Sequence, residues 1–151
     1  MYKRILVATD SSKTAALALE EACKLARGAA DARLRIVHVV DSPYDYADAW
    51  YSALSVDVEA VQRAWRRVGQ EILEKAGAQA AAAGVPAETV LLETEGRRVS
   101  RAVVEEAERW AAEVIVIGSH GRQDREQLLI GSVAEGVTRT ARLPVLLVRA
   151  R

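Results

Sequence analysis

The chain has 151 residues, of which 50% are hydrophobic and 28% are charged, a composition typical of one globular domain. Lysine and arginine together number 21, as do aspartate and glutamate, so the net charge gives no reason to expect nucleic acid or an anionic membrane as a partner. Apolar runs such as those at 114–117 and 145–148 are far shorter than the roughly 20 residues that cross a bilayer. We therefore expect a single domain over residues 1–151 with no membrane partner.

The amino terminus and the cysteine content bear on the cellular compartment. Met1–Arg4 leads directly into a short apolar run and lacks the cleavage site of a signal peptide. The one cysteine, Cys23, has no partner for an intramolecular disulfide, and its position among alanines and leucines predicts a buried side chain. These features favour a reducing, cytoplasmic location.

In the first third of the chain, predicted strands and helices alternate. The apolar run Lys3–Thr9 predicts a strand, and the Asp-Ser-Ser sequence at 10–12 suits the start of a helix. Apolar residues at helical spacing extend over Lys13–Arg27, and the next strand is predicted at Leu34–Val40. Tyr44–Ser55 contains several aromatic residues without a regular period, and we interpret it as a surface connection.

The remaining elements continue this alternation. An apolar stripe at intervals of three and four residues predicts a long helix that runs towards Gly84: Val58, Val61, Trp65, Val68 and Ile72. Beyond it we predict a strand at Thr89–Glu93, a helix at Val99–Trp110, a strand at Glu113–Ile117, a helix from Gly131 and Ser132, and a strand at Pro144–Arg149.

Several side chains have a structural interpretation. The three tryptophans, Trp50, Trp65 and Trp110, are expected to cover hydrophobic surface, and His38 is expected to be a hydrogen-bonded core residue within its strand. Charged residues in and before the Val99–Trp110 helix are expected to form a solvent-exposed face with favourable pairs: Arg97, Arg98, Arg101, Glu105, Glu106, Glu108 and Arg109.

The order of these elements predicts the fold class. Five strands separated by helices imply right-handed crossovers and an open, mostly parallel α/β sheet with helices on both faces. Strand Pro144–Arg149 is expected at a sheet edge, yet residues 145–148 carry no charge that would discourage pairing with another strand. We therefore expect a second copy of the chain to cover this edge in a homodimer.

Ligands of open parallel sheets bind at the carboxyl ends of the strands. The connection after the fourth predicted strand fits the spacing GxxG, nine residues, GS: Gly118, Gly121, Gly131 and Ser132. Glycine lets the main chain approach a phosphate closely, and a helix that begins near Gly131 would direct its free amides towards that anion. His120 and Arg122 could approach the same anion. Taken alone, the pattern also fits ordinary turns.

Other motifs for phosphate chemistry are absent from the sequence. It has no GxxxxGK[ST] sequence, and no GxGxxG follows the first strand. A phosphoacceptor receiver domain would need paired acids after the first strand and a lysine near the last one, but Leu143–Arg151 contains no lysine. We find neither a nucleophile-elbow GxSxG nor a metal-ligand cluster.

Three segments together resemble the nucleotide-binding signature of the universal stress protein family: Gly118–Arg122, Leu128–Glu135 and Leu143–Val148. Lys3–Asp10 is similar to the first strand and acidic turn of that family, and Val37–Val40 is similar to the end of its second strand. The resemblance implies a five-stranded parallel sheet of order 3-2-1-4-5 and a homodimer. In members with this glycine pattern it also implies bound ATP, or ADP or AMP in its place, with or without Mg²⁺.

The resemblance further implies roles for individual residues. Adenine and ribose would lie among Ala8, Thr9, Asp10 and Val39, with Gly118 and Ser119 nearby. The phosphates would be held by Gly121, Arg122, Gly131, Ser132 and Val133. Two departures are Gln123 and Asp124, where many relatives have small residues, and Ala8, where some nucleotide-binding relatives have proline.

The leading hypothesis is an ATP-binding regulatory protein of the stress response, with at most slow hydrolysis or self-phosphorylation. One alternative is a Mg²⁺-dependent ATPase or phosphotransferase in which Asp10, Asp41 or Asp124 contacts the metal. The other is a dimeric interaction module whose glycines serve only turns. The sequence contains no convincing general base beside the expected phosphates, which favours the regulatory hypothesis.

Overall fold

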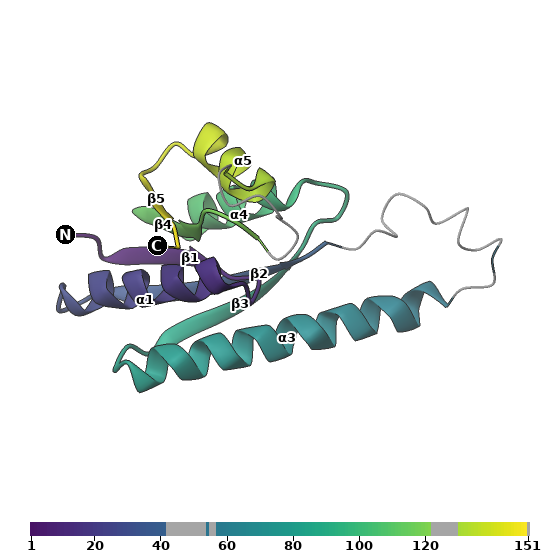
Figure 1. Ribbon diagram of the computed structural model, residues 1–151, viewed down its shortest axis with the longest axis horizontal. Helices are drawn as coiled ribbons and strands as arrows, with labels where there is room; N and C mark the ends of the chain where they lie inside the picture. The colour runs from purple at the N-terminus through teal and green to yellow at the C-terminus, as the bar shows by residue number, and fades with distance from the viewer. Residues whose placement is uncertain (42–53, 55–56, 122–129, 151) are drawn as a thin grey trace.

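The computed structural model describes residues 1–41, 54, 57–121 and 130–150 (Figure 1). The strands are β1 (Arg4–Ala8), β2 (Arg33–Val40), β3 (Ala87–Glu93), β4 (Val114–Gly118) and β5 (Val145–Val148). The helices are α1 (Lys13–Arg27), α3 (Val58–Ala82), α4 (Val99–Arg109) and α5 (Ser132–Thr140). Trp50, Arg122, Asp124 and most of the predicted connection Tyr44–Ser55 lie outside the described residues.

The strands form one parallel sheet in the order β3-β2-β1-β4-β5, which confirms the expected topology. Leu6 of β1 is in register with Arg35 of β2 and with Ile115 of β4. The central strands β1 and β4 are short and aliphatic, and their side chains are buried on both faces, as is typical of a parallel sheet covered by helices. No helix in the described part of the chain is long and apolar enough to cross a membrane.

Helices α1 and α3 cover one face of the sheet, and α4 and α5 cover the other (Figure 1). The chain moves outward from β1 to β3 and then returns to β4 and β5, so right-handed crossovers place the two helix pairs on opposite faces. Successive strand residues therefore enter different cores. Ile5 and Val7 pack with the α1 side, whereas Leu6 packs with α4 and α5.

Helix α1 begins as the Asp-Ser-Ser sequence predicted. The Ser12 hydroxyl accepts a hydrogen bond from the amide of Ala15 at 3.2 Å, and Asp10 Oδ1 accepts one from the amide of Ser12 at 2.9 Å. These bonds satisfy amides that have no partner within the helix. Cys23, farther along α1, is 2% exposed, and burial raises the pKa of its thiol. The predicted buried cysteine is thus confirmed.

The amino-terminal half of α3 departs from the prediction. Ile72 is 9% exposed, but Trp65 and Val68 are 45% and 46% exposed. Gly69 lies directly against Leu91 and His38 of the sheet, and Arg66, three residues earlier, pairs with Glu93 at the end of β3. The apolar stripe of α3 therefore continues past the sheet, where its side chains are about half exposed.

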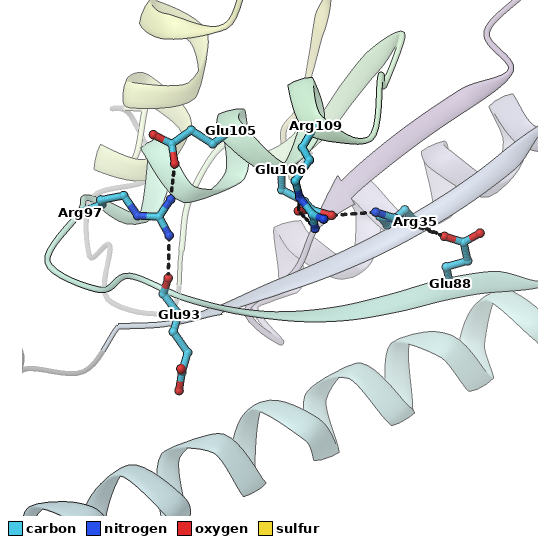
Figure 2. Close-up of polar contacts among 7 residues, drawn as sticks. All are labelled: Arg35, Glu88, Glu93, Arg97, Glu105, Glu106 and Arg109. Carbon is cyan, nitrogen blue, oxygen red and sulfur yellow. Dashed lines mark hydrogen bonds and ion pairs between the residues drawn. The ribbon is translucent and has the colours of Figure 1, made fainter.

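The predicted solvent-exposed face of α4 also needs a correction, because Glu106 is only 3% exposed. Its carboxylate accepts a hydrogen bond from Arg35 Nη1 at 2.7 Å and another from Arg109 (Figure 2). Arg35 also pairs with Glu88 at 2.6 Å and lies over the ring of Trp110, 4.6 Å from its centroid. Trp110 packs on the α4 core as expected.

Arg97 organises the connection from β3 to α4. Its Nε donates to the carbonyl of Thr94 at 3.0 Å and its Nη2 to the carbonyl of Glu93 at 3.2 Å, and its guanidinium also pairs with Glu105 (Figure 2). The hydrogen bond from Arg101, assisted by Arg97, holds the pKa of Glu105 below its ordinary value. These bonds fix the point at which α4 begins.

Candidate functional site

A pocket opens at the carboxyl ends of β1, β2 and β4, between these strands and the first turns of α4 and α5. Most of the predicted site residues line it: Ala8, Thr9, Asp10, Val39, Gly118, His120, Gly121 and Val133. These residues come from segments far apart in the chain. The parallel sheet brings them together because all its strands end at the same edge.

The other predicted residues lie behind or beside the pocket. Ser119 is buried, and its amide donates to the carbonyl of Val148 at 2.8 Å. Gly131 is buried as well, and its amide donates to the Ser119 carbonyl at 2.6 Å, which ties the start of α5 to the end of β4. Ser132 is the exposed first residue of α5. Arg122 falls outside the described residues.

An apolar wall of the pocket was not predicted. It consists of Ala15, Val37, Val99, Val103, Ile117 and Ala134, and the ring of His38 completes the lining. Val99 and Val103 reach the pocket because α4 crosses back over the sheet after β3. Their spacing of one helical turn indicates a shared face, but only the crossover brings that face to the site.

Packing against the start of α1 also requires glycine at position 118. A Cβ atom at this position would lie 2.6 Å from Thr14 Oγ1 and 2.9 Å from the amide nitrogen of Ala15. Real Cβ atoms do not approach other atoms so closely, so β4 can pass the start of α1 only with glycine here. Thr14 then donates a hydrogen bond from its hydroxyl to the carbonyl of His120.

Two histidines line the pocket with different hydrogen bonds. His38 Nδ1 lies 2.8 Å from the carbonyl oxygen of Thr9, so this nitrogen carries the proton and donates it. The ring is partly buried and satisfied there, as predicted, but it also faces the pocket. His120 Nδ1 lies 2.8 Å from Ser119 Oγ, whereas its Nε2 is buried without a hydrogen-bond partner among the described residues.

The electrostatic character of the site is set by helix ends and by one carboxylate. The first turns of α1 and α5 both reach the pocket, and the amino-terminal ends of helices carry partial positive charge. Asp10 is the acidic residue in the lining. In the described part of the chain, no three His, Cys, Asp or Glu side chains gather into a group that could hold a metal ion. The pocket combines an apolar wall with the amides at two helix amino termini, which suit an anion.

Comparison with known proteins matches this arrangement to one family. The model of the universal stress protein family matches residues 1–149. The chain belongs to the universal stress protein family. A universal stress protein of Methanocaldococcus jannaschii is 35% identical over 150 residues, which cover 99% of this chain and 83% of the relative.

Solved universal stress proteins share the fold of this one. The crystal structure of a family member from Burkholderia pseudomallei is 35% identical, with a TM-score of 0.75 and coverage of 99% of this chain and 97% of that one. A universal stress protein crystallised in complex with cAMP is 25% identical, with a TM-score of 0.71 and coverage of 99% of each chain. In the present universal stress protein, Gly118 ends β4, and Gly131 and Ser132 stand at the start of α5.

Proposed function

We propose that this universal stress protein binds an adenine nucleotide, with ATP as the leading candidate, in the pocket at the carboxyl ends of β1, β2 and β4. The observation that carries the proposal is the pocket itself, which joins an apolar wall to the amino-terminal end of α5. A flat aromatic base suits the first part, and phosphates suit the second.

The base and the ribose are assigned to the side of the pocket formed by β1 and β2. Val39 and Val99 offer apolar surface to the adenine ring from a strand and from a helix. Thr9 and Asp10 follow β1 and offer oxygen atoms to the ribose hydroxyls or to the base edge. Ala8 leaves room beside them, because it is the smallest apolar side chain on this part of the wall.

The phosphates are assigned to the first turn of α5. Gly131 is the N-cap of this helix, and Ser132 and Val133 follow it with amides that have no partner within the helix. Helix amino termini of this kind bind phosphate through such amides and through their partial positive charge. Gly121 approaches from the end of β4, and Arg122 is proposed to add a positive charge.

The family supports the same ligand class. The relative that was crystallised with cAMP aligns over 99% of this chain, and cAMP contains the adenine, ribose and phosphate for which the pocket has complementary parts. His120 Nδ1 lies 2.8 Å from Ser119 Oγ, but Ser119 is fully buried behind the pocket, so this pair does not offer a nucleophile to a bound nucleotide. We therefore propose a regulatory role in the cytoplasm, with at most slow hydrolysis or self-phosphorylation.

The regulatory proposal includes a homodimer formed through β5. Leu146 is 37% exposed on this edge strand, and Val145 and Leu147 on either side are partly exposed. An apolar edge strand without charges is prone to pair with another strand. Because the amide of Ser119 donates to the carbonyl of Val148, the edge is joined directly to the nucleotide pocket.

A pair of substitutions at Ser132 tests the nucleotide site without damaging the helix. Ser132→Glu places a carboxylate where the phosphates are proposed to lie, yet an acidic residue in the first turn favours helix formation. Ser132→Gln is the uncharged control of nearly the same size. Isothermal titration with ATP, ADP and AMP, with and without Mg²⁺, should show loss of about tenfold or more in affinity for the glutamate variant relative to the glutamine variant.

The same samples distinguish the alternative functions. Nucleotide released from the purified, denatured protein would support the site directly, whereas no release and no binding would favour an interaction module. Multiple-turnover phosphate release that requires Mg²⁺ and Asp10 would instead identify an ATPase. Light scattering that finds a monomer at micromolar concentration would remove the dimer from the proposal.

A further inference from the structure

Gly136 stands in the middle of α5, although glycine is one of the poorest helix formers. A Cβ atom at this position would lie 2.4 Å from Ser100 Oγ and 2.6 Å from Ser100 Cβ, both on α4. Real Cβ atoms do not approach other atoms so closely. The backbone of α5 therefore lies directly against a side chain of α4 at this point, and only glycine permits the approach.

This contact lies beside the pocket. Ser100 is 8% exposed in the first turn of α4, and Val99 and Val103 of the same helix line the pocket. On α5, Val133 lines the pocket and lies about one turn before Gly136, so the two are neighbours on the helix surface. The contact between Gly136 and Ser100 therefore sets how far apart α4 and α5 hold the two sides of the pocket.

The two helices carry different parts of the proposed ligand site. Val99 of α4 offers apolar surface to the adenine ring, whereas the amides of Ser132 and Val133 in α5 are assigned to the phosphates. Both helices lie on the same face of the sheet (Figure 1), and in the described part of the chain no main-chain hydrogen bond joins them. The side chains at their contact therefore decide their spacing, as is general for packed helices.

From this geometry we propose that the contact between Gly136 and Ser100 sets the distance between the base and phosphate subsites, so that a nucleotide engages both at once. The inference rests on the proposed nucleotide site. A methyl group at position 136 would reach ordinary van der Waals separation from Ser100 only if the two helices moved apart by about 1 Å. Hydrogen bonds from main-chain amides to phosphate oxygens are about 2.7–3.2 Å long and weaken over such a displacement.

The affinity that a ligand gains from its phosphate measures this alignment. AMP and adenosine share the base and the ribose, so the ratio of their affinities isolates the contribution of the phosphate. Isothermal titration of both ligands should show a ratio about fivefold to tenfold smaller for Gly136→Ala than for the unsubstituted protein. A loss of folded protein alone lowers both affinities equally and leaves the ratio unchanged.

Ser100→Gly combined with Gly136→Ala is the decisive variant, because it removes both Ser100 atoms that the new methyl group would meet. This double variant should recover the ratio of the unsubstituted protein. Ser100→Ala combined with Gly136→Ala retains only the Cβ contact and should give an intermediate ratio, and it replaces the single variant if Gly136→Ala alone does not fold.

Gly77→Ala is the matched control. It makes the same change within α3, where a Cβ atom would lie 3.4 Å from Thr89 Cγ2, at ordinary van der Waals distance. Its ratio should equal that of the unsubstituted protein. Thermal unfolding of each variant without ligand checks that the fold is intact.

The outcomes separate this inference from the nucleotide site. A ratio that is unchanged in folded Gly136→Ala, or in its Ser100→Ala replacement, overturns the role of the contact and leaves the site standing. A ratio that falls and is not restored by Ser100→Gly shows that Ser100 is not the partner, and it overturns the inference as well. If the unsubstituted protein binds ATP but binds AMP no more tightly than adenosine, the inference fails and the nucleotide site remains. If no nucleotide binds, both proposals fail.

Discussion

Arg35 of β2 and Glu106 of α4 form an ion pair of 2.7 Å that is almost completely removed from water on the carboxylate side. Glu106 is 3% exposed, and the Arg35 side chain, which lies over the ring of Trp110, is 16% exposed. The pair joins a strand to the helix whose first turn lines the pocket. Removing one partner of such a pair destabilises the fold, because the other charge is then buried without an opposite charge beside it.

Removing the buried carboxylate of Glu106 should therefore destabilise the folded protein. Glu106→Ala leaves Arg35 with only the exposed Glu88 as its partner, and we expect a loss of about 3 kcal/mol in the free energy of unfolding. Arg109→Ala removes an arginine that is 70% exposed, so its effect should stay below about 1 kcal/mol. Urea denaturation measures both, and equal losses would contradict the assigned role of the buried pair.

The ends of α3 and α4 provide a matched pair of backbone conformations. Gly84 has φ +76° and Ala111 has φ +55°, and both follow a helix in the same hydrogen-bond arrangement, from Val85 to Ala80 and from Ala112 to Ala107. A left-handed conformation costs a residue with a Cβ about 1–2 kcal/mol. Ala111→Gly should therefore stabilise the protein by about 1 kcal/mol and Gly84→Ala should destabilise it by a similar amount, as read from thermal unfolding.

Side-chain truncation should affect stability differently in the two halves of α3. Ile72 is 9% exposed, so Ile72→Ala should cost about 3 kcal/mol through lost burial and a cavity. Trp65 is 45% exposed, and Trp65→Ala should cost less than about 1 kcal/mol despite the larger side chain removed. Chemical denaturation of the two variants checks the order, and a larger loss at Trp65 would show that this half of α3 is packed.

Gly118 should be intolerant of a methyl group even without nucleotide. Gly118→Ala forces contact with the backbone of α1, and we expect a loss of about 2 kcal/mol in the free energy of unfolding. Gly77→Ala is the control, because a Cβ there would be 3.4 Å from Thr89 Cγ2 and alanine favours a helix. The control should be neutral or stabilising. Should Gly118→Ala keep full stability and lose only nucleotide, its role is ligand approach and not packing.

The hydrogen bonds to Glu105 should make the stability of the protein depend on pH in the acidic range. Hydrogen bonds from Arg101 and Arg97 lower the pKa of Glu105 from its ordinary value of 4.5, so the folded state favours the carboxylate. The stabilisation from the Glu105 carboxylate is fully present at pH values above its ordinary pKa. It is lost as the pH falls through the lower pKa of the folded state. The difference in stability between the unsubstituted protein and Glu105→Gln should therefore shrink on acidification through this range. A difference that stays constant would contradict the shift.

The fold was predictable because local patterns and topology rules agree. Aliphatic runs such as Val114–Ile117 predict buried parallel strands, and the helices between them impose crossovers of one hand. The start of α1 was equally readable, since Ser12 caps the helix through an interaction between near neighbours in the chain. Information of this kind lies within a few residues, so the sequence carries it directly.

Other features depend on distances between segments that are remote in sequence. The sequence places Glu106 on an exposed helix face, but in the fold Arg35 of β2 pairs with it and it is buried. Trp65 belongs to the apolar stripe of α3, yet it is 45% exposed where the helix extends beyond the sheet (Figure 1). The pocket wall at Val99 and Val103 has the same origin, because α4 passes over the sheet on its return from the edge.

By itself, the sequence determined the order of the elements, the parallel α/β class, the cap of α1 and the glycine pattern around Gly118, all of which rest on short-range preferences and on a recognisable spacing. Only the tertiary structure decided that Val99 and Val103 join the pocket, that Gly118 must also admit α1, and that His120 Nε2 is left without a partner among the described residues. The physical reason is that burial and hydrogen bonding are properties of packed neighbours, which the chain acquires only when its distant segments meet.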